Sequence, residues 1–329
     1  LGRITLQAAT ETGIPNGLPL IASGSDKACE VLGTGCIDSQ TGSLSYGSLA
    51  TLNIASDKYI EAIPFYPAYP GVIPKTFNIE MMVQRGYWMV SWFKKEFGLH
   101  EERVAADQKV SPESLFDELL AKVPAGSQGL MLQPYWSPSN GDGPETRGAV
   151  IGFNEEHTRA HLYRAMIEGL TYALREGKEL LEKRSKTKIT RLVVSGGGSQ
   201  SDQIMQITAD IFGMTVFRPH TFETSSLGAA IAGAVGVALV DEYYEAAGID
   251  PRRIEYLRRE ILSMTSSTGL DKDAGLSGED EDSDLAKLDS YLCELKEAQI
   301  RDGLHIFGSS PVNDLERDLA IALVRVPRG

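Results

Sequence analysis

Residues 191–201 read RLVVSGGGSQS, and their types and order suit chemistry on a bound ligand. An apolar run ends at Ser195, three glycines follow, and an apolar periodicity begins at Ile204. This order predicts a strand, a glycine turn and a helix. Glycine lets the backbone approach a ligand closely because no Cβ intervenes, and the N–H groups that open a helix attract anions. The stretch therefore suits a nucleotide, although a tight turn in any α/β protein has the same pattern.

Two further stretches place polar groups at turns. Asp26 follows the apolar residues 18–24, which predict a short buried strand. A carboxylate at the end of such a strand can accept the proton of a hydroxyl group, or it can cap the following helix. Residues 42–54 alternate around Gly47 and predict a hairpin. At its tip, backbone N–H groups and the Ser48 hydroxyl can reach phosphate oxygens, or the tip is an ordinary turn.

These turns need a scaffold of strands and helices. The longest expected helix covers residues 157–184, with Thr158 as its cap. Strands that alternate with long helices predict an α/β fold. In chain order, the expected elements are the strand 18–24, the hairpin 42–54, the helices 78–97 and 112–123, the strand 129–136, the helix 157–184, the strand 189–194, the helix 201–213, the strand 215–219 and the apolar helix 227–240.

Charge and cysteine content exclude several classes of partner. The 329 residues carry a net charge of −13, which argues against a nucleic acid or an anionic membrane as the main partner. The apolar run 227–240 is too short to span a bilayer. Cys29, Cys36 and Cys293 form no close metal-type pair, and an odd number of cysteines fits a reducing compartment. We therefore expect a cytoplasmic protein.

The first three quarters of the chain resemble the FGGY carbohydrate kinase family, the sugar and polyol kinases of the actin-like ATPase superfamily. The resemblance covers about residues 1–247 and implies the second, C-terminal lobe of these enzymes. The implied fold is an actin-like (ribonuclease H-like) α/β lobe with a mixed sheet flanked by helices. Five blocks match in family order: ASGSDKACEVLGTG (22–35), SYGSLAT (45–51), the loop and helix at 129–169, SGGGSQSDQIMQITADIFG (195–213) and ETSSLGAA (223–230).

This resemblance implies ATP-dependent phosphorylation of a sugar or polyol hydroxyl, with Mg²⁺ arriving on the nucleotide. Asp26 falls at the position of the family's catalytic base. His157 and His161 have the spacing of metal ligands, but no third ligand is near them in the sequence, so we expect no metal site there. The implied contacts to ATP are Gly47, Ser48, Gly196, Gly197, Gly198, Ser199, Ser201 and Gln206.

One departure from the family pattern affects the expected activity. The family's first lobe begins with a D-x-G-T block that binds phosphate and magnesium, and that lobe carries most sugar contacts. Nothing like this block occurs in the sequence, and Leu1 falls near the end of that lobe. We therefore expect the chain to lack the N-terminal lobe and to be inactive as a kinase on its own. The alternative from another class is a non-catalytic nucleotide-binding module.

The last part of the chain, from about residue 248, differs from the rest in composition and in its expected elements. Residues 271–284 form an acidic linker, and residues 285–308 have a single helical pattern, so this segment is expected to be mainly helical. Residues 248–329 resemble the large subunit of aerobic cobaltochelatase, a relative of the magnesium chelatase large subunit; KEAQIRDGLHIFG carries much of this resemblance. A third hypothesis is therefore a fragment of a cobaltochelatase subunit acting in cobalamin biosynthesis. We expect a chimeric chain with a junction near residue 248.

Overall fold

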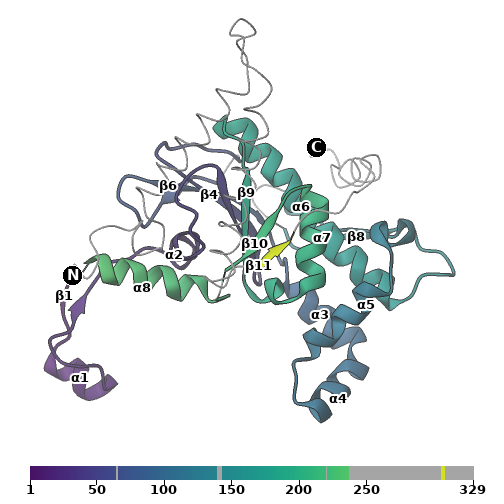
Figure 1. Ribbon diagram of the computed structural model, residues 1–329, viewed down its shortest axis with the longest axis horizontal. Coiled ribbons are helices and arrows are strands. Elements are labelled where there is room, and N and C mark those ends of the chain that lie inside the picture. The colour runs from purple at the N-terminus through teal and green to yellow at the C-terminus, as the bar shows by residue number, and fades with distance from the viewer. Residues whose placement is uncertain (64–65, 139–142, 220, 237–304, 308–329) are drawn as a thin grey trace, which may run out of the picture. The chain divides into compact units, whose positions relative to one another are not determined.

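Figure 1 shows the computed structural model. The chain divides into two compact units. Within the described ranges, one unit comprises Leu1–Ala22 with residues 230–236 and 305, and the other comprises Ser23–Ala229 with residues 306–307. No described helix is long and apolar enough to cross a membrane. The described residues are 1–63, 66–138, 143–219, 221–236 and 305–307.

The N-terminal part of the first unit is a two-stranded ribbon around a short helix. Strands β1 (Gly2–Arg3) and β2 (Pro19–Leu20) pair antiparallel on either side of helix α1 (Leu6–Thr12). The helix buries none of its residues. The prediction of a buried strand over residues 18–24 is therefore wrong: the strand is two residues long and exposed, because it pairs with β1 alone and joins no larger sheet.

The second unit is built on a seven-stranded mixed sheet, which confirms the expected α/β lobe. Strand β9 runs parallel to both of its neighbours, β10 and β3, whereas β3, β4, β6 and β5 pair antiparallel in succession. The strands lie in the order β11 (His305–Phe307), β10 (Val216–Arg218), β9 (Arg191–Ser195), β3 (Thr41–Tyr46), β4 (Ala50–Ser56), β6 (Phe77–Val83) and β5 (Tyr69–Pro70).

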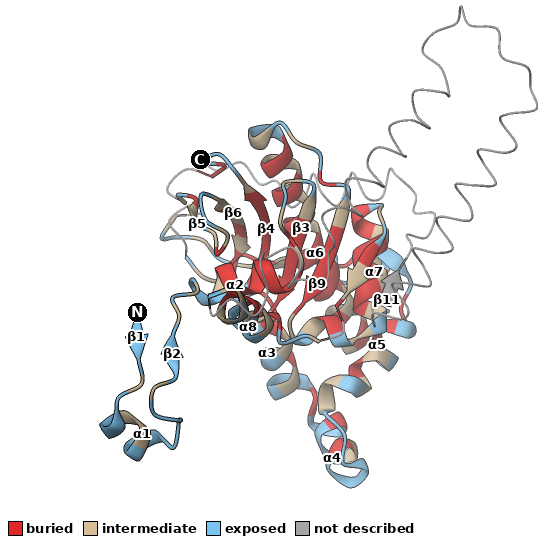
Figure 2. Ribbon diagram, turned by 60° about the vertical axis from the view of Figure 1, so that its left-hand side comes forward, coloured by how far each residue is buried: buried red, intermediate tan, exposed pale blue. Residues whose placement is uncertain are grey.

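The two faces of this sheet differ in chemistry, although both are buried (Figure 2). Successive residues of a strand point to opposite faces, and partners in register share a face. One face is apolar and packs against helix α6 (Arg159–Ser185), where Met81 meets Gly177. The other face is polar along three neighbouring strands, and its buried polar residues are Ser43, Ser45, Thr51, Asn53 and Asn78.

Residues 77–83 form a strand where the sequence predicted the start of a helix over 78–97. Strand β6 pairs with the whole of β4, and the helix α3 begins only at Trp88 and ends at Phe97. Arg85, with φ 60°, interrupts the backbone between them. Apolar and polar residues alternate over residues 77–81, and cross-strand pairing with β4 selected this period over the helical one.

The helices expected over 157–184 and 201–213 are confirmed with small shifts at their ends. The single helix expected over 112–123 is not found: a 3₁₀ turn and a five-residue α-helix occupy this stretch. Helix α6 begins after Thr158, which forms a capping box with His161. The remaining elements are α2 (Asp26–Gly33), α4 (Leu99–Gln108), the 3₁₀ turn η1 (Pro112–Phe116), α5 (Asp117–Ala121), the turn η2 (Ala125–Gly129), the paired strands β7 (Met131–Gln133) and β8 (Ala149–Ile151), the turn η3 (Gly197–Gln200), α7 (Asp202–Phe212) and α8 (Thr224–Gly236).

The expected apolar helix 227–240 begins earlier, at Thr224, and its residues after 236 lie outside the described ranges. Its start packs closely on α2, because a Cβ at Gly228 would lie 1.8 Å from the Cys29 carbonyl oxygen. Of the helix expected over 285–308, only residues 305–307 are described, and they form strand β11. The acidic linker 271–284 also lies outside the described ranges.

Candidate functional site

Asp26 is the first residue of helix α2, and its carboxylate is exposed. Ser25 caps the helix: its Oγ accepts from the Ala28 N–H at 3.1 Å. Asp26 Oδ1 accepts from the N–H of Lys27 at 2.7 Å. The capping role that the sequence left open for Asp26 therefore belongs to Ser25, and the Asp26 carboxylate lies at the surface where it can meet a hydroxyl group.

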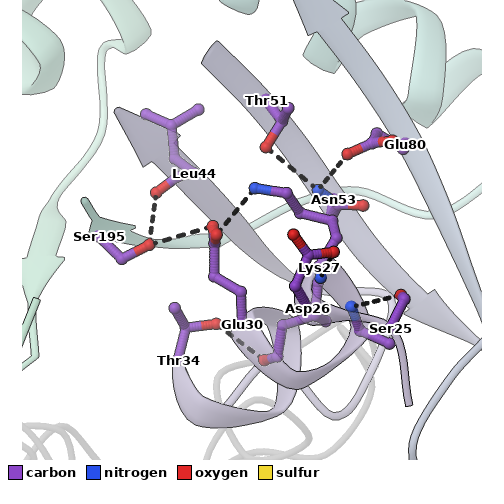
Figure 3. Close-up of polar contacts among 12 residues, drawn as sticks. Ser25, Asp26, Lys27, Glu30, Thr34, Leu44, Thr51, Asn53, Glu80 and Ser195 are labelled. Carbon is purple, nitrogen blue, oxygen red and sulfur yellow. Dashed lines mark hydrogen bonds and ion pairs between the residues drawn. The ribbon is translucent and has the colours of Figure 1, made fainter. Parts of the chain in front are cut away.

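Beneath Asp26, helix α2 is joined to the polar face of the sheet by a buried carboxylate (Figure 3). Glu30 forms an ion pair with Lys27, at 2.8 Å between Nζ and Oε2. Its other oxygen accepts a hydrogen bond from Ser195 Oγ at 3.3 Å. Ser195 is the last residue of β9, so this contact links the helix of Asp26 to the strand that enters the glycine turn.

A second group of polar side chains continues along the same face of the sheet (Figure 3). Asn53 Nδ2 donates to Glu80 Oε1 at 3.3 Å, and Asn53 Oδ1 accepts from the Tyr69 hydroxyl at 2.9 Å. Burial raises the pKa of Glu80, and the Asn53 amide and the Lys27 ammonium partly oppose that rise. The sequence pattern did not single out Asn53 or Glu80 as site residues. The signal that could have found them is the polar residue at every second position of their strands, because those positions share one face of the sheet.

The β3–β4 hairpin turns at residues 47–49, as the sequence predicts. Ser48 is exposed at this tip. The Gly47 carbonyl accepts a hydrogen bond from the N–H of Tyr87 at 3.1 Å. The Gly47 carbonyl is therefore held by the protein, while Ser48 stays at the surface.

The sheet brings this hairpin tip and the glycine turn together. Strands β3 and β9 are parallel neighbours with Ser45 opposite Ser195, so both chains leave the sheet at the same edge. Ligands of α/β sheets bind outside this carboxyl edge. A Cβ on Gly196 would lie 2.8 Å from the carbonyl carbon of Tyr46, which shows how closely the two turns pass.

The three glycines of the turn differ in backbone conformation and in the space available for a side chain. Gly196 has φ 80° and passes the Tyr46 carbonyl, so a side chain is excluded by both conformation and space. Gly198 faces the Tyr87 ring, where a Cβ would lie 2.4 Å from Cε1. A Cβ on Gly197 would meet no atom within 4 Å. Only Gly197 therefore presents open backbone of the kind a ligand can cover.

The remaining residues predicted to contact ATP have partners within the protein. Ser199 is buried, and its Oγ donates to the Gly196 carbonyl at 2.7 Å. Ser201 caps α7 by accepting from the Ile204 N–H, and it donates to Asp117. Gln206 Nε2 donates to an aspartate on its own helix, Asp210, at 2.9 Å. These contacts shape the turn and its helix, and contact with a nucleotide stays a prediction for all three residues.

His157 and His161 belong to the start of α6. His157 Nδ1 accepts from the Asn154 N–H at 2.8 Å, and His161 Nδ1 accepts from the Thr158 N–H at 3.2 Å. Each ring thus uses one nitrogen to fix the chain that enters the helix. Within the described ranges, no three His, Cys, Asp or Glu side chains are grouped to hold a metal ion.

The mixed sheet, its flanking helices and the paired turns at the carboxyl edge are the architecture of one lobe of an actin-like ATPase. Residues 42–237 match the C-terminal domain of the FGGY family of carbohydrate kinases. The chain belongs to this family.

Similar proteins agree with this assignment. An uncharacterized sugar kinase of Escherichia coli is 34% identical over 249 residues, which are 75% of this chain and 50% of that protein. The crystal structure of xylulose kinase from Rhodospirillum rubrum has a TM-score of 0.58 at 28% identity and covers 72% of this chain and 46% of that one. The chain therefore spans about half the length of the kinases it matches.

The end of the chain matches a second family. Residues 237–329 match CobN/Magnesium Chelatase. The aerobic cobaltochelatase subunit CobN of a Sinorhizobium species is 61% identical over 93 residues, which are 28% of this chain but 7% of that protein. Both predicted resemblances are thus confirmed. The two matches meet at residue 237, and the domain boundary near residue 248 stays a prediction.

Proposed function

We propose that this chain provides the nucleotide side and the catalytic base of a kinase that phosphorylates a hydroxyl group of a sugar or polyol. MgATP would supply the phosphoryl group and neutralise much of its charge. The observation that carries the proposal is the common edge of the sheet: the hairpin tip, the glycine turn and the helix of Asp26 converge there through the Ser45–Ser195 register and the Glu30–Ser195 hydrogen bond.

Asp26 is the proposed base. Its carboxylate is exposed at the start of α2, and Ser25 already caps the helix. Residues 28–33 of α2 are buried, with Ala28, Cys29 and Leu32 in the interior, so the helix holds the carboxylate on a rigid support. Asp26 would accept the proton of the attacking hydroxyl, a contribution that typically amounts to about 10²–10⁴ in rate.

The two turns are the proposed nucleotide contacts. The open backbone at Gly197 suits the adenosine, since no atom of the described residues lies within 4 Å of a Cβ placed there. Gly47 and Ser48 lie at the adjacent hairpin tip and would offer N–H and hydroxyl donors to phosphate oxygens. Magnesium would arrive bound to the phosphates of the nucleotide.

Calorimetric titration with MgADP tests the nucleotide site. Binding is the first measurement because the chain spans about half the length of its kinase relatives. We expect the wild-type chain to bind MgADP and Asp26→Asn to bind it equally well, since Asp26 is proposed to contact the acceptor rather than the nucleotide. Failure of the wild-type chain to bind MgADP would contradict the proposal.

Phosphoryl transfer separates a kinase from a non-catalytic nucleotide-binding module. Labelled ATP is offered with xylulose, gluconate and glycerol, the compounds named for similar kinases. Transfer that disappears in Asp26→Asn supports a kinase with Asp26 as base. Nucleotide binding without transfer to any of the three supports the module, or the expected inactivity of this chain on its own. Restoration of transfer by an added N-terminal kinase lobe distinguishes these two.

The match of residues 237–329 to CobN favours a separate origin for that segment. We propose that it takes no part in the kinase chemistry, because the contacts that assemble the candidate site in the described part of the chain lie between Ser25 and Thr208.

A further inference from the structure

We propose that Tyr87 is a positioning residue that holds the β3–β4 hairpin tip and the glycine turn as one rigid unit. The inference rests on the proposed function, in which one turn contacts phosphate and the other contacts adenosine. Tyr87 lies between β6 and α3, far from both turns in the sequence. It contacts both of them through different parts of the residue.

The backbone and ring of Tyr87 fix the hairpin. Its N–H donates to the Gly47 carbonyl at 3.1 Å. Its ring stacks on Tyr46, the last residue of β3, with 4.4 Å between centroids and 22° between planes. Gly86, directly before Tyr87, approaches Ala50 so closely that a Cβ would lie 2.3 Å from the Ala50 nitrogen. Both strands of the hairpin are therefore held from the same side.

The same pair of rings supports the glycine turn. A Cβ on Gly198 would lie 2.4 Å from the Tyr87 ring and 2.8 Å from Tyr46 Cβ. The Tyr46 hydroxyl hydrogen-bonds Thr208 on α7, the helix that follows the turn, at 2.6 Å. The middle of the turn thus packs against the two rings, and the helix that follows it, α7, is hydrogen-bonded to one of them.

The ring of Tyr87, rather than its hydroxyl, carries this role. The residue is buried, and its hydroxyl oxygen has no hydrogen-bond partner in the described part of the chain. Stacked aromatic pairs contribute beyond the area that they bury, and losing an unpaired buried hydroxyl removes no hydrogen bond. Tyr87→Phe therefore retains the support, and Tyr87→Leu removes the stacking surface.

Amide hydrogen exchange tests the support without any ligand. We expect Tyr87→Leu to accelerate exchange at residues 47–50 and 196–201 together, by about tenfold or more, because local opening of both turns becomes easier. Tyr87→Phe should leave both at wild-type rates. Tyr163→Leu removes another buried aromatic residue of the same core and controls for general destabilisation. Unchanged exchange in either turn of Tyr87→Leu, with the protein folded, overturns the proposal.

If Tyr87→Leu does not fold, Gly198→Ala replaces it, because the added methyl group pushes the turn away from the same ring. It must accelerate exchange in the hairpin tip as well as in its own turn. Acceleration confined to residues 196–201 would show that the two turns move independently and would overturn the proposal.

A nucleotide readout separates this inference from the proposed function. MgADP uses both turns whereas adenosine uses one, so loss of their fixed spacing should reduce the preference for MgADP over adenosine by about tenfold in Tyr87→Leu. Tyr163→Leu and Tyr87→Phe should keep the wild-type preference. An unchanged preference in Tyr87→Leu overturns the inference alone, whereas a wild-type chain that binds neither compound overturns the proposed function and the ligand role of Tyr87 with it.

Discussion

Ser195 donates a hydrogen bond to Glu30 at 3.3 Å across a separation of 165 residues. Glu30 lies one helical turn after Asp26 on the same helix, and Ser195 lies directly before the glycine turn. The contact therefore joins the proposed base to the proposed nucleotide platform. One Glu30 oxygen accepts from Ser195 and the other pairs with Lys27, so this buried carboxylate is a polar tie between α2 and the sheet.

A double-mutant cycle measures this link. We expect Glu30→Ala and Ser195→Ala to be non-additive in the free energy of unfolding, with an interaction energy of about 0.5–3 kcal/mol, because each removes the partner of the other. Urea unfolding of the two single variants and the double variant gives the value. The control pair is Glu30→Ala with Ser111→Ala, whose hydroxyl pairs with Ser114 instead. Additive effects in the first cycle would contradict the link.

Alanine at Gly197 and at Gly198 should separate ligand contact from packing. Gly198→Ala meets the Tyr87 ring, so we expect a loss of about 1–3 kcal/mol in the free energy of unfolding. Gly197→Ala meets no atom within 4 Å and should change stability by no more than about 0.5 kcal/mol. If Gly197 lies against adenosine, its variant nevertheless weakens MgADP binding. Thermal unfolding and calorimetry give the two quantities, and a Gly197→Ala chain with unaltered MgADP affinity would remove Gly197 from the site.

Glu80 should make stability depend on pH in a defined direction. Burial raises the pKa of Glu80 in the native state, so the native chain keeps a proton that the unfolded chain has released. The free energy of unfolding therefore falls as pH rises from the unfolded pKa through the raised native pKa. Glu80→Gln imitates the protonated form and can still accept from Asn53, so this fall should disappear.

Urea unfolding between about pH 4 and about pH 8 covers the relevant range for a carboxyl group. The stability of Glu80→Gln relative to wild type should grow with pH and then level off. Glu102→Gln changes an exposed carboxylate on α4 and serves as the control. A relative stability that falls with rising pH would show that the Glu80 carboxylate is stabilised in its charged form.

The junction between the two family matches can be tested at the level of DNA. If the chain joins two gene fragments, amplification of genomic DNA across the codons for residues 225–255, which include both residue 237 and residue 248, should give no contiguous product. The kinase match ends and the CobN match begins at residue 237, and the CobN match covers 7% of its relative. A contiguous native product would contradict a junction made by joining unrelated fragments.

The sequence by itself determined the local features of this protein. The apolar period and the Thr158 cap specified α6, and the order of strand, three glycines and amphipathic run specified β9, η3 and α7. Alternation around Gly47 specified the hairpin. These features depend on neighbours in the chain, because helix period, capping and turn geometry are local properties. The ordered blocks also identified the kinase family, which the match over residues 42–237 confirms.

Only the tertiary structure decided what depends on distant partners. Residues 77–83 form a strand because they pair antiparallel with the whole of β4. Residues 19–20 form an exposed strand because they pair only with β1 among the described strands. The Tyr87 ring leaves no room for a side chain at residue 198. Ser195, far away in the sequence, is the hydrogen-bond partner of Glu30. Such relationships arise from packing between segments that the chain keeps far apart, and no local pattern contains them. The sequence thus predicts the glycine turn. Only the tertiary structure shows that Gly196 and Gly198 are packed against other residues, whereas Gly197 is open.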